Sequence, residues 1–161
     1  MAGPDGPMFD LPIDTVYVWL GVAAVSAAAL AVVLALPTTA PPDAAAAADA
    51  VDRVVVEPPG SQATRQIDAE AIRLGPRQIS LRNEAGSASA SVAYGPITPT
   101  LTDDRLELVL HGRPPSVVFE SPVAFAEAVE TAQTRTDWRP APERIEIRRV
   151  DWGGIDVTLV G

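Results

Sequence analysis

The sequence predicts an α+β protein: an N-terminal transmembrane helix, an Ala-rich helix, and a small antiparallel sheet of about five strands with two short helices on one face. Three observations lead to this fold class. Residues 16–36 form one long apolar run without a charge. Beyond residue 60, short runs alternate apolar and polar residues, which is typical of half-buried strands. Between these runs, two segments space their apolar residues as an amphipathic helix does.

The apolar run at 16–36 has the length of a single membrane span. Its 21 residues give a helix of about 30 Å, which matches the hydrocarbon core of a bilayer. Tyr17 and Trp19 lie near one end, where aromatic rings favour the interface. The chain therefore divides into a short acidic tail (1–15), a transmembrane helix (16–36), a Pro- and Ala-rich linker with a short helix (37–60) and an α+β domain (61–161).

Two alternatives use the same apolar residues. A secretory signal peptide would begin with basic residues, whereas residues 1–15 hold three Asp and no Arg, and two prolines follow the candidate cleavage point at 38–40. A buried helix of a soluble core would have a polar face, whereas only the hydroxyls of Thr15 and Ser26 interrupt this run. The pattern favours an uncleaved anchor that contacts the lipid bilayer through residues 16–36.

We expect the C-terminal domain to be extracytoplasmic, on a single-pass protein of the cell membrane. The positive-inside rule gives no direction, because the first basic residue is Arg53. The expectation depends instead on layout, since a short tail followed by one span is common among anchored exported domains.

The charge composition argues against a nucleic-acid partner. The chain has 21 acidic and 12 basic residues, and affinity for nucleic acid comes largely from basic side chains that neutralise phosphates. All basic residues are Arg and none is Lys, which is typical of proteins from extremely halophilic archaea, with a GC-rich bacterial genome as the alternative. The absence of Cys excludes disulfides and thiolate metal sites.

The segment between the apolar run and the domain predicts a short helix from Asp43 to Val55. Asp43 suits the N-terminal end of a helix, and the Ala run that follows has the highest helix propensity of any residue. Glu57-Pro58-Pro59-Gly60 ends it. The alternative is a low-complexity tether.

Strand patterns occupy two parts of the domain. Residues 64–94 predict an antiparallel meander of three strands, with turns at Gly75-Pro76 and at 83–86. Residues 145–159 alternate around Trp152-Gly153-Gly154, which predicts a β-hairpin.

Two short amphipathic helices are expected between these strand regions. In "TDDRLELVLHG", Thr102 takes the N-cap position and Gly112 ends the helix. In "SPVAFAEAVETAQ", Ser121 is the cap and Pro122 the first helical residue.

Few residues are candidates for chemistry, and for each a structural role is the simpler interpretation. His111, the only histidine, falls in the last turn of a predicted helix, where positive charge is favoured. Asp103, Asp104 and Glu107 form the densest acidic group, a candidate for a hard cation, but acids in the first turn of a helix are explained by capping.

Hydroxyl and aromatic side chains give two weaker candidates. Ser87, Ser89 and Ser91 alternate along one predicted strand, as on an ordinary exposed face. Trp138 and Trp152 are candidates for a sugar-stacking platform, although aromatics at sheet ends more often close a core. No nucleophile elbow, nucleotide loop or metal-ligand cluster is present in the sequence, so we predict no catalytic residue, no cofactor and no metal site.

The chain resembles haloarchaeal type IV pilin-like proteins, the small membrane proteins associated with pilus or secretion systems. The likeness lies in "AADAVDRV" (47–54), "IRLGPRQISLRNEAG" (72–86) and "VAYGPITP" (92–99). The resemblance implies a leading helix followed by a β-rich domain. A prepilin has a basic residue just before the apolar run, where its peptidase cuts; residues 1–15 have none, which favours an unprocessed accessory protein.

These features together predict a membrane-anchored structural or accessory component of a surface assembly, with no catalytic activity. Its expected partners are membrane or filament proteins, contacted through small residues at Gly21, Ala24 and Ala28 and at 44–48. The alternative is a stand-alone, membrane-tethered extracytoplasmic binding domain.

Overall fold

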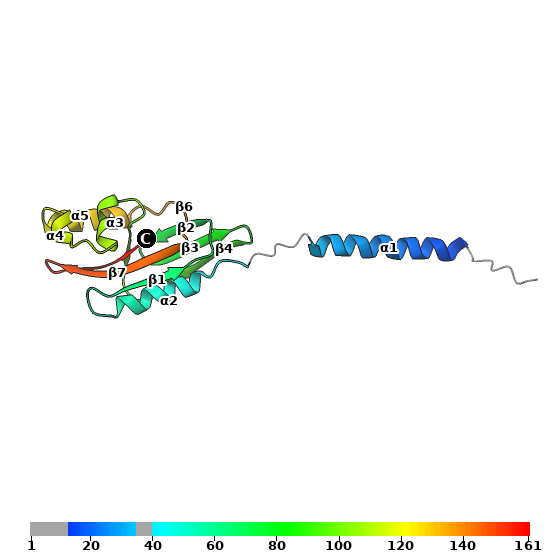
Figure 1. Cartoon of the computed structure of the whole chain (residues 1–161), viewed down its shortest axis with the longest axis horizontal. Helices are drawn as coiled ribbons and strands as arrows, with labels where there is room; N and C mark the ends of the chain where they lie inside the picture. Colours follow the sequence, from blue (N-terminus) through cyan, green and yellow to red (C-terminus); the bar gives the residue numbers. More distant parts are fainter. Residues whose placement is uncertain (1–12, 35–39) are drawn as a thin grey trace, which may run out of the picture. The chain divides into compact units, whose positions relative to one another are not determined.

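The computed structural model describes residues 13–34 and 40–161. Within 13–34, side chains are described at residues 16–32. The chain divides into two compact units (Figure 1). The first unit ends at Thr38 and the second begins at Thr39.

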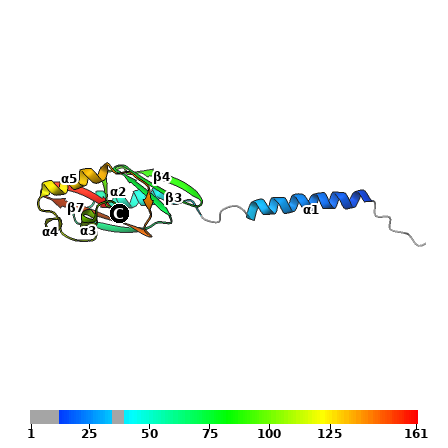
Figure 2. The same ribbon diagram turned by 90° about the horizontal axis from the view of Figure 1, so that it is seen from above.

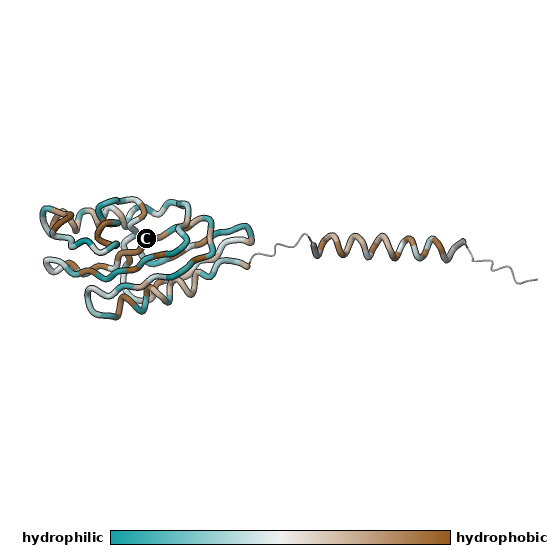
Figure 3. The backbone as a smooth tube through the Cα atoms, in the orientation of Figure 1, coloured by the Kyte–Doolittle hydropathy of each residue, from teal (hydrophilic) through white to brown (hydrophobic). Residues whose placement is uncertain are grey.

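In the described part of the first unit, the chain forms helix α1 at Ile13–Leu34. Its described side chains are mostly apolar, with Tyr17 and Trp19 about two-thirds exposed (Figure 3). Within the described residues, no helix is long and apolar enough to cross a membrane. This finding contradicts the single-pass transmembrane helix predicted at 16–36. Residues 35 and 36 of the predicted span lie outside the described residues.

The second unit is α+β, with two sheets of four strands (Figures 1 and 2). Sheet A has the order β1-β7-β8-β5 and sheet B the order β4-β3-β2-β6. The strands are β1 Gln62–Gln66, β2 Ala71–Gly75, β3 Gln78–Asn83, β4 Gly86–Ser91, β5 Ile97–Pro99, β6 Arg139–Pro140, β7 Arg144–Trp152 and β8 Ile155–Val160; the helices are α2 Ala44–Val55, α3 Asp104–Leu110, α4 Pro115–Val118 and α5 Pro122–Gln133.

The predicted single antiparallel sheet of about five strands is therefore wrong. Strands β2, β3 and β4 form the expected antiparallel meander, and β7 and β8 the expected hairpin. The meander and the hairpin belong to different sheets, and each gains a strand from a segment distant in sequence. Strand β5 pairs in parallel with β8 of the hairpin, and β6 pairs with β2 of the meander. Local alternation of apolar residues does not encode which distant strand a segment will pair with.

Helix α2 confirms the helix predicted at 43–55 and excludes the tether. The carboxylate of Asp43 caps it by accepting a hydrogen bond from the Ala46 N–H at 2.9 Å. Its buried face is made mostly of alanines, and it contacts strands of both sheets. Small side chains allow this close approach to β4, whose inward residues are Ala88 and Ala90.

Helices α3 and α5 confirm the two predicted amphipathic helices and lie against sheet A. Ser121 caps α5, and Pro122 is its first residue, as expected. The cap of α3 is Asp103 rather than Thr102, because the Asp103 carboxylate accepts from the N–H groups of Arg105 and Leu106. The short helix α4 was not predicted. In both Figure 1 and Figure 2, these helices gather at one end of the domain and the β3–β4 hairpin reaches the other.

The domain has two apolar clusters, one on each face of sheet A. The first lies between α2 and the inner faces of both sheets and includes Ile145 and Ile147 of β7. The second lies between sheet A and helices α3, α4 and α5, and includes Val150 and Phe125. Successive residues of a strand point to opposite faces, so β7 serves both clusters.

Two adjacent arginines of β7 form hydrogen bonds with the ends of helices that pack on the two faces of sheet A. Arg149 donates to the Val55 carbonyl at the end of α2 at 2.8 Å and pairs with Asp156 of β8. Arg148, on the other face, donates to the Val109 carbonyl near the end of α3 at 2.7 Å. The hydrogen bond from Arg149 lowers the pKa of Asp156, and the same bond raises the pKa of Arg149. Both faces of sheet A are therefore covered by other parts of the domain.

Candidate interaction surface

The outer face of sheet B is the candidate functional site. The alternation of β2 places Ile72 and Leu74 in the first apolar cluster, so Arg73 between them points outward. In β3, Leu81 is buried inward, and the next residue, Arg82, is exposed on the outer side. The fold therefore sets two guanidinium groups on neighbouring strands of one face.

Both of these arginines place their guanidinium groups over the ring of Trp138. It lies in the segment that leads into β6, with the Arg73 guanidinium 5.0 Å and the Arg82 guanidinium 4.7 Å from the centre of its ring. A guanidinium within about 6 Å of an aromatic ring is attracted by the ring's electrons, worth about 0.5–1 kcal/mol at an exposed site. The ring holds the two charges close together without neutralising them.

None of the arginines on this face forms an ion pair with a carboxylate among residues 40–161. The ion pairs there involve Arg105, His111 and Arg149, which belong to other parts of the domain. The β2–β3 hairpin, residues 71–83, contains three arginines and no acid. The segment from Pro41 onward has a net charge of 12 − 18 = −6, so this hairpin is a basic exception on an acidic domain.

A shallow cavity of about 360 Å³ opens beside the cluster. Arg73, Arg77, Gln78, Ser80 and Thr136 are among the residues that line it, and none of the lining residues is acidic. The Ser89 hydroxyl of β4 donates to the Ser80 hydroxyl at 2.8 Å, so the floor of this face is polar. We call Arg73, Arg77, Gln78, Ser80, Arg82 and Trp138 the Arg–Trp face.

The chemistry of the Arg–Trp face suits carboxylates, phosphates or sulfates. Guanidinium groups bind such planar or tetrahedral anions with two parallel hydrogen bonds, and an indole ring beside them adds apolar contact area. Guanidinium is also weakly hydrated, so it is readily used at protein interfaces.

The acidic and histidine candidates from the sequence have structural partners. Asp103 caps α3, and Glu107 and Asp104 lie in the first turn of that helix. His111 is the C-cap of α3, with its Nε2 3.6 Å from a carboxylate oxygen of Glu146. In the described part of the chain, no group of His, Asp and Glu is arranged to hold a metal ion.

The fold separates the two tryptophan candidates and places the three serines on the outer face of sheet B, opposite Arg82, Ser80 and Gln78. Ser87, Ser89 and Ser91 lie on the exposed side of β4, as expected of an ordinary strand face. Trp152 packs beside Phe125 in the second apolar cluster, with ring centres 5.9 Å apart. Trp138 lies instead between two arginines, so the two tryptophans do not form the predicted pair.

Three of the five alanines predicted as a partner surface at 44–48 pack inside the domain, while Ala45 is exposed and Ala46 is partly exposed. Ala44, Ala47 and Ala48 are buried in the first apolar cluster. The exposed Arg–Trp face was missed from the sequence because Trp138 is distant from Arg73 and Arg82 along the chain. One signal was present: the acid-free hairpin 71–83 in an otherwise acidic chain.

The comparisons with known proteins identify a family without a function. A family model described as "Family of unknown function (DUF7283)" matches residues 10–150. No curated protein and no solved structure matches the chain. The family match covers 150 − 10 + 1 = 141 of the 161 residues, and the chain therefore belongs to this family of unknown function, DUF7283.

Proposed function

We propose that this protein is a non-catalytic structural or accessory component of a surface assembly, and that it holds a partner protein at the Arg–Trp face. The observation that carries the proposal is the pair of guanidinium groups of Arg73 and Arg82, gathered on one tryptophan and left without carboxylate partners among residues 40–161.

Physical reasons support a protein partner at this face. Two arginines held together repel each other, and the attraction to Trp138 offsets only part of that cost. An acidic partner would remove the repulsion and form charge-assisted hydrogen bonds. Arg and Trp are also the residues most enriched among those that dominate binding at protein interfaces.

The rigid support of the face favours the same function. Strands β2 and β3 are fixed from behind by Ile72, Ile79 and Leu81, none more than 1% exposed. A pre-ordered surface binds with less loss of conformational entropy than a flexible loop. The sequence resemblance to pilin-like accessory proteins supports an assembly as the setting.

The test is photo-cross-linking in the cells that make the protein. A photoreactive residue at Gln78, which is exposed on the Arg–Trp face, should give a discrete adduct that mass spectrometry identifies as a component of a pilus or secretion system or as a further copy of this chain. Gln62 is the matched control, an exposed glutamine on β1 of sheet A. Equal adducts from both positions, or none from Gln78, would contradict the proposal.

A stand-alone binding domain is the second candidate, favoured by the cavity beside Arg73. Its size and basic, hydroxyl-bearing lining suit a small carboxylated or phosphorylated ligand. Titration of the full chain with inorganic phosphate and with oligogalacturonate separates the two functions. Saturable binding that Arg73→Ala abolishes, together with no adduct from Gln78, would favour the binding domain.

A further inference from the structure

We propose that the partner at the Arg–Trp face is a second copy of this chain, which docks its helix α5 there through Glu127 and Glu130. The inference rests on the proposed function, because it names the partner of the same surface. Its basis is that one chain carries two surfaces of opposite charge at different places on the domain.

The acidic surface is the helical layer on sheet A. Residues 103–133, which include α3, α4 and α5, contain six acids and two arginines, a net charge of 2 − 6 = −4. One of the two arginines, Arg105, already pairs with Asp103 and lies over the Phe119 ring. The helical layer therefore has acids that are free to pair, whereas every charged residue of the hairpin 71–83 is an arginine.

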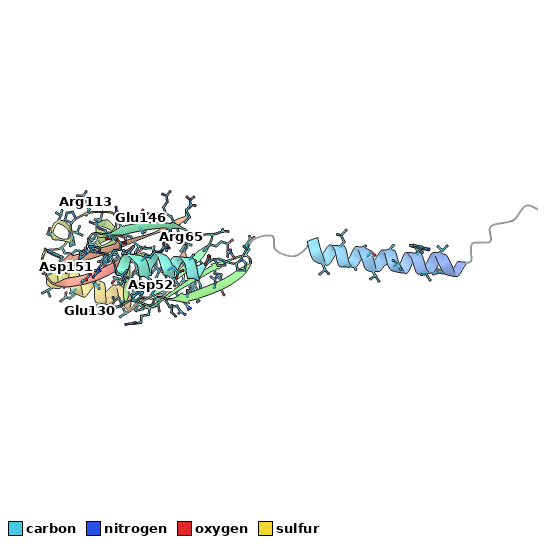
Figure 4. The ribbon with its side chains drawn as sticks, turned by 90° about the horizontal axis from the view of Figure 1, so that it is seen from below. Asp52, Arg65, Arg113, Glu130, Glu146 and Asp151 are labelled. Atoms are coloured by element: carbon cyan, nitrogen blue, oxygen red, sulfur yellow. The ribbon has the colours of Figure 1, made fainter. Side chains whose placement is uncertain are left out.

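Within that layer, α5 presents a continuous exposed stripe. Val123, Glu127 and Glu130 follow one another at spacings of four and three, so they lie on one face of the helix, opposite the buried Phe125, Ala128 and Val129. All three are exposed, and Val123 is 67% exposed (Glu130 is labelled in Figure 4). Neither glutamate is in an ion pair among residues 40–161.

The distance between Glu127 and Glu130 on α5 is similar to the distance between Arg73 and Arg82 on sheet B. Glutamates three apart on a helix have Cβ atoms about 5–6 Å apart. Arg73 and Arg82 are diagonal neighbours, since Arg73 faces Ser80 and Arg82 faces Ala71, and such neighbours lie about 7–8 Å apart. The flexible arms of Arg and Glu cover the difference, so each guanidinium can meet one carboxylate. Val123, farther along the stripe, extends the contact with an apolar side chain.

The contact joins two different surfaces of the chain. Helices α3, α4 and α5 gather at one end of the domain (Figures 1 and 2), and the Arg–Trp face lies on the outer side of sheet B, with its cavity bordered by Thr136, which follows α5. Two different surfaces in contact make a heterologous interface, which forms a ring where the rotation between copies closes and an open row of copies where it does not. Such a contact can extend a row of subunits, as a component of an assembly requires.

The experiment uses full chains in a charge-swap design. One copy carries the photoreactive residue at Gln78, and the other carries a tag that changes its size. The face variant is Arg73→Glu/Arg82→Glu in the first copy, and the helix variant is Glu127→Arg/Glu130→Arg in the second. A matched control variant, Glu57→Arg/Glu143→Arg, makes the same charge change at exposed positions outside α5.

The expected result is a cross-link from Gln78 to α5 of the tagged copy, located by peptide mass spectrometry. The face variant should lower its yield at least about tenfold against an unchanged partner, because glutamates would then face glutamates. The helix variant should restore the yield with the face variant, and the control variant should not. Restoration also shows that the face variant is folded.

Other outcomes separate this inference from the proposed function. If Gln78 cross-links in cells to a different assembly component and never to α5, a second copy is the wrong partner and the proposed function stands. If Gln78 yields no adduct in cells or between purified copies, while each variant unfolds cooperatively, both are wrong. The proposal of a second copy would also be overturned if oligogalacturonate lowered the yield of the Gln78 adduct and the helix variant left that yield unchanged.

Discussion

The two sheets of the domain differ in what lies against them. Sheet A has apolar cluster residues on both faces, with Ile147 on one side and Val150 on the other, and two of its arginines, Arg148 and Arg149, bind helix ends. Sheet B contributes residues to an apolar cluster from its inner face only, and its outer arginines bind no carboxylate among residues 40–161.

This difference separates arginines that stabilise the fold from arginines that are available for binding. Arg149 and Arg73 are the same residue type on neighbouring sheets, but Arg149 satisfies carbonyls of the chain and a carboxylate of the adjacent strand. Arg73 contacts Trp138. What distinguishes Arg73 is its position over the Trp138 ring beside a second arginine, since Arg105 and Arg149 are the arginines in ion pairs among residues 40–161.

The largest expected effect is on the helical side of sheet A. Phe125→Ala should destabilise the domain by about 3–5 kcal/mol, because the fully buried ring packs on Phe119 and Trp152 and its loss leaves a cavity. Urea unfolding measures the change. Val123→Ala, on the exposed side of the same helix, is the control and should shift stability by less than about 0.5 kcal/mol. Similar losses for both would mean that α5 does not pack as described.

An intermediate loss of stability is expected at helix α2, which packs against the inner faces of both sheets. Asp43→Ala should cost about 1 kcal/mol, because it removes the oxygen that accepts from the Ala46 N–H at the start of α2. Asp43→Ser should retain most of the stability, since a hydroxyl caps nearly as well. If Ser and Ala replacements were equally destabilising, the cap would not be the cause.

A smaller effect on stability is expected on the outer side of sheet B. Trp138→Leu should change the free energy of unfolding by no more than about 1 kcal/mol, the size of an exposed attraction between cation and ring. The same change should reduce the cross-link from Gln78 strongly, because the two guanidinium groups would no longer be held together. A large loss of stability would assign Trp138 to the core rather than to the binding surface.

The last prediction concerns pH and the arginine of sheet A. The pKa of Asp156 is lowered in the folded state, so its pairing with Arg149 stabilises the domain above the ordinary Asp pKa of about 4. That contribution should be lost as pH falls below about 4 and through the lowered pKa. Asp156→Asn should show a weaker decline in stability over this range than the unchanged chain, as measured by thermal unfolding. Parallel declines would contradict the role of the pair.

Local signals in the sequence predict the elements well where caps and turns are explicit. Ser121-Pro122 begins α5, and Gly153 and Gly154 form the hairpin turn with φ of 63° and 84°, which favour glycine. The α+β class and both amphipathic helices follow from such signals. The division into two sheets does not, because it depends on which distant strands pair, as β5 does with β8.

The candidate surface shows the same limit. The alternation of β2 and β3 predicts that Arg73 and Arg82 lie opposite the buried Ile72 and Leu81, but not that Trp138 will lie beside them. The length of an apolar run was likewise an incomplete guide at 16–36, since the described residues contain no helix that could span a membrane.

The most direct test of the account is a paired measurement on Arg73→Glu/Arg82→Glu in the full chain. Stability by urea unfolding and the yield of the Gln78 cross-link in cells are measured on the same variant. We expect stability to change by no more than about 1 kcal/mol, because these two side chains give the fold only their attraction to the Trp138 ring, which their mutual repulsion partly offsets, while the cross-link is lost. A cross-link retained at full yield, or lost only together with the fold, would contradict the assignment of this face to a partner.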